Sequence, residues 1–429
     1  MKDYRIYWIW LAERAGQASA LAVKLINRYG NASSVYAASA EDIERDLSDV
    51  LTPREMGKAR QILSDKSTDV AERILEDAAS LGQRVIVPTD EDYPRSLASL
   101  RNAPMVLYVM GTLPRLRDEL CIAVVGTRTM SDSGRRNSYA MGYGLASGGA
   151  VVVSGMALGC DGMALSGAIS AGGKTIAVLG GGVDVIYPKD HTTLYSTILK
   201  SGAIISEYPP GTRPSGYNFP VRNRIISGLS AGSVIVEASD GSGALITASQ
   251  AAEQGRDVFV IPGNVDVAAC AGSNALLRDG AIAVSTGWDI LSEYVALFPD
   301  QIRKDGLPSM QTLYPDEESA IRAAERPAEK VAQKSRHLKN KDAEKPEADK
   351  KAIDNEPKSL YSEKIDIEDP SLTGDERTIL ALLRDGERLV DDVIAESGLT
   401  SGTTLSTLTL LEVKGLIRRL PGRYVCLSR

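Results

Sequence analysis

Short apolar runs alternate with stretches of helical periodicity through the middle of the chain. Most of these runs are apolar throughout, which is typical of strands that are covered on both faces of a sheet. The pattern therefore predicts a mainly parallel, doubly wound α/β sheet within residues 76–300. The predicted strands are residues 84–88, 105–109, 121–126, 150–155, 175–180, 203–207, 233–238, 257–263 and 281–285.

Two smaller domains are expected to flank the sheet. Residues 1–75 hold apolar clusters at helical spacing, which predicts a small helical domain. Residues 373–429 hold three short helical patterns and then two strand patterns joined through Pro421 and Gly422, which predicts a winged helix-turn-helix. Eight Lys/Arg balance eight Asp/Glu in this last segment, so DNA reading and docking to a protein both stay open.

Residues 301–372 interrupt these patterns. Over residues 301–371 the chain has 14 Lys/Arg, 16 Asp/Glu and six Pro. Such a composition buries too little apolar surface to offset the entropy of folding. We expect a charged, disordered linker here.

The charge and the cysteines limit the classes of partner. The net charge is −7, so attraction to nucleic acid must come from a local basic patch. The four cysteines are far apart in the sequence, which favours a reduced protein without structural disulfides or a zinc site. The N-terminus has neither the pattern of a signal peptide nor that of a membrane span. We therefore expect a cytoplasmic protein without a membrane partner.

The predicted carboxyl ends of the strands are rich in glycine and small hydroxyl residues. They include Gly126, Thr127 and Arg128 after one strand and Gly180–Gly182 after another. Ligands of open α/β sheets bind at these ends, where backbone N–H groups and helix N-termini face an anion. This edge of the sheet is the predicted ligand site.

Arginines make this edge electropositive. Arg128 lies in one strand-to-helix turn, and Arg222 and Arg224 flank Asn223 at the start of a predicted helix. A guanidinium donates two parallel hydrogen bonds to a phosphate and keeps its charge, and nearby Phe219 offers a ring to a base. The structural alternative is that Arg222 or Arg224 pairs with Glu207 or Glu237 and that the Phe219 ring lies in the core.

Other chemistries find less support. GAISAGGKT (167–175) misses the spacing of a phosphate-binding loop, and the Gly180–Gly182 run lacks the later glycine of a dinucleotide site. A Ser-His-Asp arrangement would depend on His191, because His337 lies in the predicted linker. No Cys or His pair has the spacing of metal ligands. We therefore expect no cofactor and no metal. The candidates for acid–base catalysis are four carboxylates near the predicted strand ends, Asp161, Asp184, Glu207 and Glu237.

Several stretches, in order, resemble the bacterial DNA-processing protein A family, DprA or Smf. They cover about two hundred residues and include IAVVGTR (122–128), SGMALGCDGMA (154–164), TIAVLGGGVDVIYP (175–188), FPVRNRIISGLS (219–230) and VIVEASDGSGALITA (234–248). LEVKGLIRRLPGRY near the end is similar to the winged helix of that family. Two positions depart from the family pattern, since Leu165 stands where histidine is usual and His191 where asparagine is frequent.

The resemblance implies an extended Rossmann-like domain that binds single-stranded DNA, forms a homodimer and helps to load the RecA recombinase during natural transformation. It also implies an N-terminal domain of the SAM or helix-hairpin-helix type. Because Leu165 replaces the histidine, the resemblance favours binding over catalysis. The implied DNA-binding residues are Gly126, Thr127, Arg128, Phe219, Arg222, Asn223, Arg224, Ser242, Gly243 and Thr247.

Three hypotheses follow for the function. The first is a non-enzymatic recombination mediator that binds single-stranded DNA, protects it and loads the recombinase. The second is a nucleotide-processing enzyme that acts on nucleoside monophosphates in the same pocket. The third is a transcription regulator that binds duplex DNA through residues 373–429.

Overall fold

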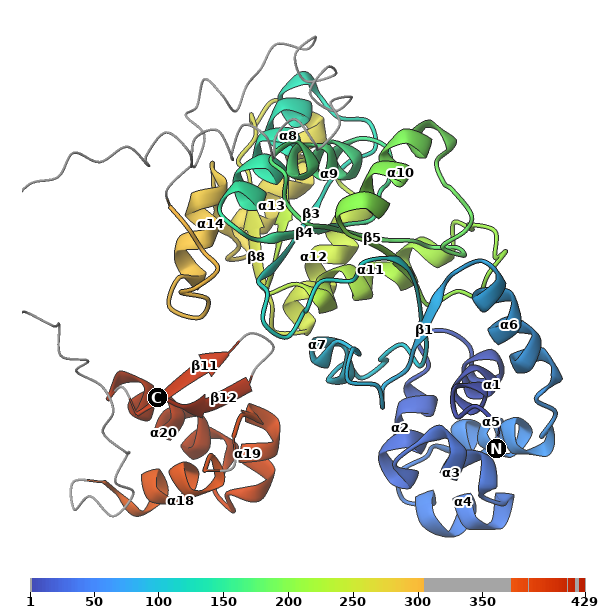
Figure 1. Cartoon of the computed structure of the whole chain (residues 1–429). Helices are drawn as coiled ribbons and strands as arrows, with labels where there is room; N and C mark the ends of the chain where they lie inside the picture. The colour runs from blue at the N-terminus through green and yellow to red at the C-terminus, as the bar shows by residue number, and fades with distance from the viewer. Residues whose placement is uncertain (1, 305–371, 385, 415, 421–423, 429) are drawn as a thin grey trace, which may run out of the picture. The chain divides into compact units, whose positions relative to one another are not determined.

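Each of the nine apolar runs overlaps a strand of one sheet (Figure 1). The sequence prediction of a mainly parallel, doubly wound sheet is confirmed. Most strands are shorter than their runs because the runs continue into the turns at the sheet edge, whereas the strand at residues 107–111 extends past the end of its predicted run and the strand at residues 232–235 begins before its run. The strands are β1 (Arg84–Ile86), β2 (Leu107–Gly111), β3 (Cys121–Val125), β4 (Val151–Ser154), β5 (Thr175–Val178), β6 (Ala203–Ser206), β7 (Gly232–Ile235), β8 (Asp257–Val260) and β9 (Ile282–Ala283).

The strand order is β1-β2-β6-β5-β4-β3-β7-β8-β9. Strands β3 to β9 pair in parallel, whereas β1 with β2 and β2 with β6 pair antiparallel. Successive strands run outward from β3 to β6, and β7 then lies on the other side of β3. This reversal is a topological switch point, so the carboxyl ends of β3 and its neighbours form a crevice suited to a ligand.

Helices cover both faces of the sheet (Figure 1). On one face α8 (Asp132–Ser147), α9 (Cys160–Ser170) and α10 (Thr192–Ser201) pack in sequence, and α14 (Gly287–Tyr294) packs against α8. On the other face α11 (Asn218–Leu229) packs against α12 (Gly243–Glu253) and the short α7 (Arg95–Ala98). The central strands are buried along their whole length, as their unbroken apolar sequences require. The remaining segments are η1 (Lys189–His191), η2 (Ala268–Cys270) and α13 (Ala271–Arg278).

Six helices precede the sheet, and their apolar side chains join its hydrophobic core in one cluster. A polar contact also links these helices to the sheet domain: the Tyr4 hydroxyl, just before the first helix, donates to Asp90 at 2.6 Å. The expected boundary at residue 75 needs correction, because the last of these helices continues past it to Ser80. The six are α1 (Arg5–Ala15), α2 (Ala20–Tyr29), α3 (Ala32–Ala37), α4 (Ala40–Leu47), α5 (Pro53–Ser64) and α6 (Asp69–Ser80).

A second compact unit holds the C-terminal segment. Its described residues form three helices and an antiparallel sheet in the order β10-β12-β11, with their own hydrophobic core. The predicted winged helix is confirmed, with the short strand β10 in addition. No Lys or Arg occurs in α20, the last of these helices. The elements are α18 (Gly374–Leu382), β10 (Arg388–Leu389), α19 (Val390–Glu396), α20 (Ser401–Val413), β11 (Ile417–Leu420) and β12 (Tyr424–Leu427).

The computed structural model describes residues 2–304, 372–384, 386–414, 416–420 and 424–428. Most of the predicted linker, His337 within it, and the turn at Pro421 and Gly422 lie outside the described residues. Among the helices within these ranges, none combines the length and the apolar character that crossing a bilayer requires.

Candidate nucleic-acid interface

A small pocket opens at the carboxyl ends of three neighbouring strands. Arg128 follows β3, Gly155 and Ala157 follow β4, and Leu179 and Gly180 follow β5. Its cavity volume is about 50 Å³. The pocket therefore lies at the edge of the sheet where the sequence predicts ligand binding. The other lining residues are Leu158, Gly181, Val185, Tyr187, Pro188, Pro214, Phe219 and Arg222.

Two glycines leave room for the side chains that α11 sends into this pocket. A Cβ atom on Gly155 would lie 2.6 Å from Nη1 of Arg222, and one on Gly180 would lie 2.9 Å from Cδ1 of Phe219. Both distances are shorter than any ordinary van der Waals contact. Glycine at these two strand ends therefore allows Arg222 and Phe219 to pack against the backbone.

Phe219 is the centre of a cluster of aromatic and cationic groups. The ring of Tyr187 stacks on it with 5.7 Å between centroids and 23° between planes. The guanidinium carbons of Arg128 and Arg222 lie 5.0 and 5.8 Å from its centroid. Both distances are within the range of cation–π attraction. The cluster places two positive charges and two aromatic rings in one pocket.

Arg222 is held in the wall of the pocket and is only 4% exposed. Its Nη1 donates to the carbonyl oxygens of Gly155, at 2.8 Å, and Val178. Its Nε is buried without a hydrogen-bond partner. The pKa of Arg222 is lowered to about 10, chiefly by burial; the charge of Asp161 opposes this shift, and the nearby charge of Arg128 contributes to it. A bound anion would relieve both the desolvation and the repulsion between the two arginines.

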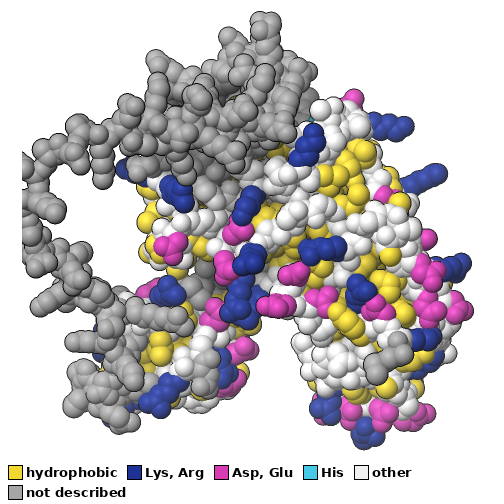
Figure 2. All heavy atoms as spheres, viewed as in Figure 1, with side chains coloured by type: hydrophobic (Ala, Val, Ile, Leu, Met, Phe, Trp, Pro, Cys, Tyr) yellow, Lys and Arg dark blue, Asp and Glu magenta, His cyan; other side chains and the backbone are white. Residues whose placement is uncertain are grey.

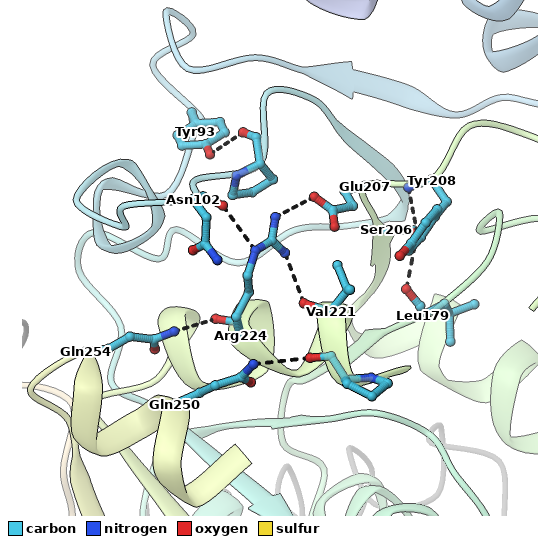
Figure 3. Close-up of polar contacts among 12 residues, drawn as sticks. Tyr93, Asn102, Leu179, Ser206, Glu207, Tyr208, Val221, Arg224, Gln250 and Gln254 are labelled. Atoms are coloured by element: carbon cyan, nitrogen blue, oxygen red, sulfur yellow. Dashed lines mark hydrogen bonds and ion pairs between the residues drawn. The ribbon is translucent and has the colours of Figure 1, made fainter. Parts of the chain in front are cut away.

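Arg224 is not among the residues that line this pocket, and Figure 3 shows its side chain directed toward Glu207 and Asn102. This placement corrects the prediction that Arg224 clamps a phosphate. The side chain is 1% exposed, and its Nη2 donates to Oε2 of Glu207 at 2.6 Å. Its Nε and Nη1 donate to the carbonyl oxygens of Asn102 and Val221. The structural alternative, an ion pair with Glu207, is therefore what the structure shows for Arg224.

The remaining predicted residues are not among those that line the pocket. Thr127 donates its backbone N–H to the Glu237 carbonyl oxygen at 2.7 Å, and Gly126 packs against Cys160. Asn223 donates to the carbonyl oxygen of Gly243 at 3.3 Å, which joins the middle of α11 to the start of α12. The other two residues belong to α12: the Ser242 side chain caps its first turn, and Thr247 is buried on its inner side.

The carboxylates considered for acid–base chemistry are already engaged. Glu237 accepts from Ser131 N and Oγ at 3.0 and 2.6 Å, which anchors the start of α8. Asp161 accepts from the N–H groups of Gly155 and Ala157, and Asp184 accepts from the Gly211 N–H. Burial raises the pKa of Asp161, although Arg222 opposes this shift. Among the described residues that line the pocket, none is Asp or Glu.

The geometry does not support a catalytic histidine or a metal site among the described residues. His191 Nδ1 lies 3.0 Å from the Met156 carbonyl oxygen, and Leu165 is fully buried in α9. Within the ranges that the structure describes, no group of three or more His, Cys, Asp or Glu side chains could hold a metal ion.

Sequence reasoning missed Tyr187 and Leu158, which line the pocket with 45% and 42% of their surface exposed. The signal was available, since both follow strand ends within the glycine-rich turns. On the face drawn in Figure 2 the basic and acidic side chains are interspersed. The pocket itself is recognised by its local cluster of arginines and aromatic rings.

The comparisons with known proteins all indicate the same family. Residues 84–295 match the model of DNA recombination-mediator protein A, and residues 368–423 match the DprA winged helix domain. The chain is 33% identical over 356 residues to Protein Smf of Synechocystis sp., covering 82% of each protein. It is 42% identical over 205 residues to DNA processing protein DprA of Streptococcus pneumoniae, covering 48% of this chain and 72% of that protein.

A solved structure of DNA processing protein A from Helicobacter pylori, described with its single-stranded DNA binding mode, is 29% identical. It covers 50% of this chain and 96% of that chain with a TM-score of 0.45. The two family matches lie on the sheet and on the C-terminal unit, and the similarity to Protein Smf extends over most of both chains. The chain therefore belongs to the DprA/Smf family of DNA recombination mediators.

Proposed function

We propose that this chain is a recombination mediator that binds single-stranded DNA at the carboxyl edge of its sheet. The observation that carries the proposal is the cluster of Arg128, Arg222, Phe219 and Tyr187 in one pocket. Arginines attract the sugar-phosphate backbone, and aromatic rings stack on bases of any sequence. This combination suits binding without sequence preference.

The two arginines have different parts in this proposal. Arg128 is exposed, so its guanidinium reaches a phosphate outside the pocket. Arg222 is buried and fixed by backbone carbonyls, so it adds a constant positive potential behind the pocket. Arg224 binds no DNA here and instead holds α11 in place through Glu207.

Further elements of the proposal go beyond the pocket. The protein acts in the cytoplasm as a homodimer, protects incoming single strands during natural transformation and loads the RecA recombinase onto them. Membership of a recombination-mediator family supports this role. Neither a cofactor nor turnover is required, because the chain only has to hold the strand and release it to the recombinase.

The alternative of a nucleotide-processing enzyme has weaker support. An acid–base mechanism needs a carboxylate or histidine that faces the substrate, whereas Glu207, Glu237 and Asp161 are engaged by their own neighbours. Turnover of nucleoside monophosphates that is lost in Glu237→Gln would revive this alternative.

The proposal is tested by fluorescence anisotropy of a labelled oligothymidine, single-stranded and then annealed to its complement. We expect the full chain to prefer the single strand and Arg128→Ala to bind it more weakly. Equal affinity for both forms, or an Arg128→Ala variant that binds as the parent does, would contradict the proposal. Loading is tested separately, by the rate at which RecA filaments form on single strands coated with a single-strand-binding protein.

A further inference from the structure

The Phe219 ring is largely enclosed before any ligand arrives. Tyr187, Arg128 and Arg222 all contact it, at centroid distances of 5.7, 5.0 and 5.8 Å. An aromatic ring has only two faces for stacking. A base that stacked directly on Phe219 would therefore have to displace one of these neighbours.

The cavity is also too small to take a base as it stands. Its volume is about 50 Å³, which holds a few water molecules at most. A base arriving from solvent would therefore rest on the rim of the pocket, against whichever ring is accessible there.

Tyr187 is the ring that the structure leaves accessible on this rim. Its side chain lines the pocket, stacks on Phe219 and is 45% exposed. No hydrogen bond of its hydroxyl group to a described residue is seen, so the stacking on Phe219 is the contact that orients the ring. A tyrosine ring that is supported on one side and open on the other resembles the platforms on which unpaired bases stack.

We propose that an unpaired base stacks on the solvent-facing side of Tyr187, while Phe219 supports the ring from behind and Arg128 holds the neighbouring phosphate. This inference rests on the proposed binding of single-stranded DNA and names the residue that makes the base contact. A base in a duplex is covered by its neighbours and cannot offer its face without unstacking. Tyr187 is then the source of the preference for single strands, whereas Arg128 supplies affinity for any phosphate backbone.

The test compares oligothymidine with an abasic oligonucleotide of equal length, bound to the full chain. Tyr187→Leu removes the ring but keeps an apolar side chain, and Tyr187→Phe keeps the ring. We expect Tyr187→Leu to weaken binding of oligothymidine by roughly 5- to 150-fold, the effect of one stacked base. Its binding of the abasic strand should change little, and Tyr187→Phe should bind both as the parent does.

Two outcomes would overturn the inference alone. One is that Tyr187→Leu binds oligothymidine as tightly as the parent while Arg128→Ala binds it more weakly. The other is that Tyr187→Leu loses affinity for both strands equally, which would indicate a structural role. If the parent itself binds no single-stranded DNA, the proposed function fails and this inference fails with it.

A second measurement needs no variant. An oligonucleotide that carries 5-iodouracil is crosslinked to the parent protein by light, and the modified residue is found by mass spectrometry. A crosslink at Tyr187 supports the inference. A crosslink at Phe219 without one at Tyr187 would mean that binding opens the pocket, and it would overturn the inference.

Discussion

Nη2 of Arg224 lies 2.6 Å from Oε2 of Glu207, and both side chains are almost fully buried. Glu207 directly follows β6, and Arg224 lies in α11. The pair therefore fixes α11 against the carboxyl edge of the sheet, and α11 carries Phe219 and Arg222 into the pocket. A charged pair at the predicted ligand site thus has a positioning role and no contact with DNA in the proposed function.

Replacing Arg224 by alanine should destabilise the fold. The change leaves the Glu207 carboxyl buried without its partner, which typically lowers the free energy of unfolding by about 3 to 5 kcal/mol. Urea unfolding measures this change. Arg224→Lys is the matched control, because it keeps the charge but loses the planar fork that reaches Glu207, Asn102 and Val221 together, and an intermediate loss is expected. A fully stable Arg224→Ala would show that the pair does not hold α11.

The instability of Arg224→Ala should depend on pH. Burial already raises the pKa of Glu207, and Arg224 opposes that shift, so removing Arg224 raises the pKa further. A carboxyl whose pKa rises on folding binds more protons in the folded state, so its contribution to stability is present at low pH and is lost as the pH rises through the folded-state pKa. Urea unfolding at about pH 5 and about pH 8 should show a smaller loss at the lower pH. An equal loss at both would contradict this account.

Replacing Arg128 by alanine should affect binding far more than stability. The side chain is exposed, no ion pair to it is seen among the described residues, and its contact with the Phe219 ring contributes about 0.5 to 1 kcal/mol at most. Its loss should therefore lower the urea midpoint only slightly while it weakens binding of oligothymidine. The contrast with Arg224→Ala separates a residue that contacts phosphate from one that positions a helix. A large loss of stability in Arg128→Ala would indicate a structural role.

The salt dependence of binding counts the phosphates that are contacted. Each phosphate neutralised on a single strand contributes about −0.7 to the slope of log affinity against log salt concentration. Arg128→Ala should make the slope less negative by about this amount, measured by anisotropy over a salt series. A slope that is the same in both proteins would mean that Arg128 contacts no phosphate.

Adding a methyl group at Gly155, which lines the pocket, should displace the neighbouring side chain of Arg222. Its Cβ would lie 2.6 Å from Nη1 of Arg222, so Gly155→Ala must push the guanidinium away from the carbonyl oxygens that hold it. We expect weaker binding of oligothymidine. Gly57→Ala in α5 is the matched control, since a Cβ there meets nothing within 4 Å. The Gly57→Ala variant should bind as the parent does, and its free energy of unfolding should rise by roughly 0.5 to 1 kcal/mol. Equal binding by parent and Gly155→Ala would show that the position of Arg222 does not matter.

Much of the fold could be predicted from the sequence, because burial of a strand on both faces leaves a direct pattern. The runs around β3, β4, β5 and β7 are apolar without interruption, and each is a buried central strand. The glycines that follow these strands predicted a ligand site at the edge of the sheet where the structure has the pocket. Arg128, Phe219 and Arg222 were singled out for the same reason, since all three lie in or beside turns at that edge.

What only the tertiary structure decided is the direction in which each side chain points. Arg222 and Arg224 are two positions apart in a helix, so they project about 200° from each other, and only one of them can face the pocket. The partner of the other, Glu207, follows the strand that immediately precedes α11, and no helical or strand periodicity relates it to Arg224. The role of Tyr187 likewise depends on its stacking against Phe219 of α11, and the sequence keeps these two residues more than thirty positions apart. The sequence by itself thus determined the sheet, its buried strands and the edge that holds the pocket, because these follow from local patterns. The choice among the arginines and aromatic rings follows from packing between elements.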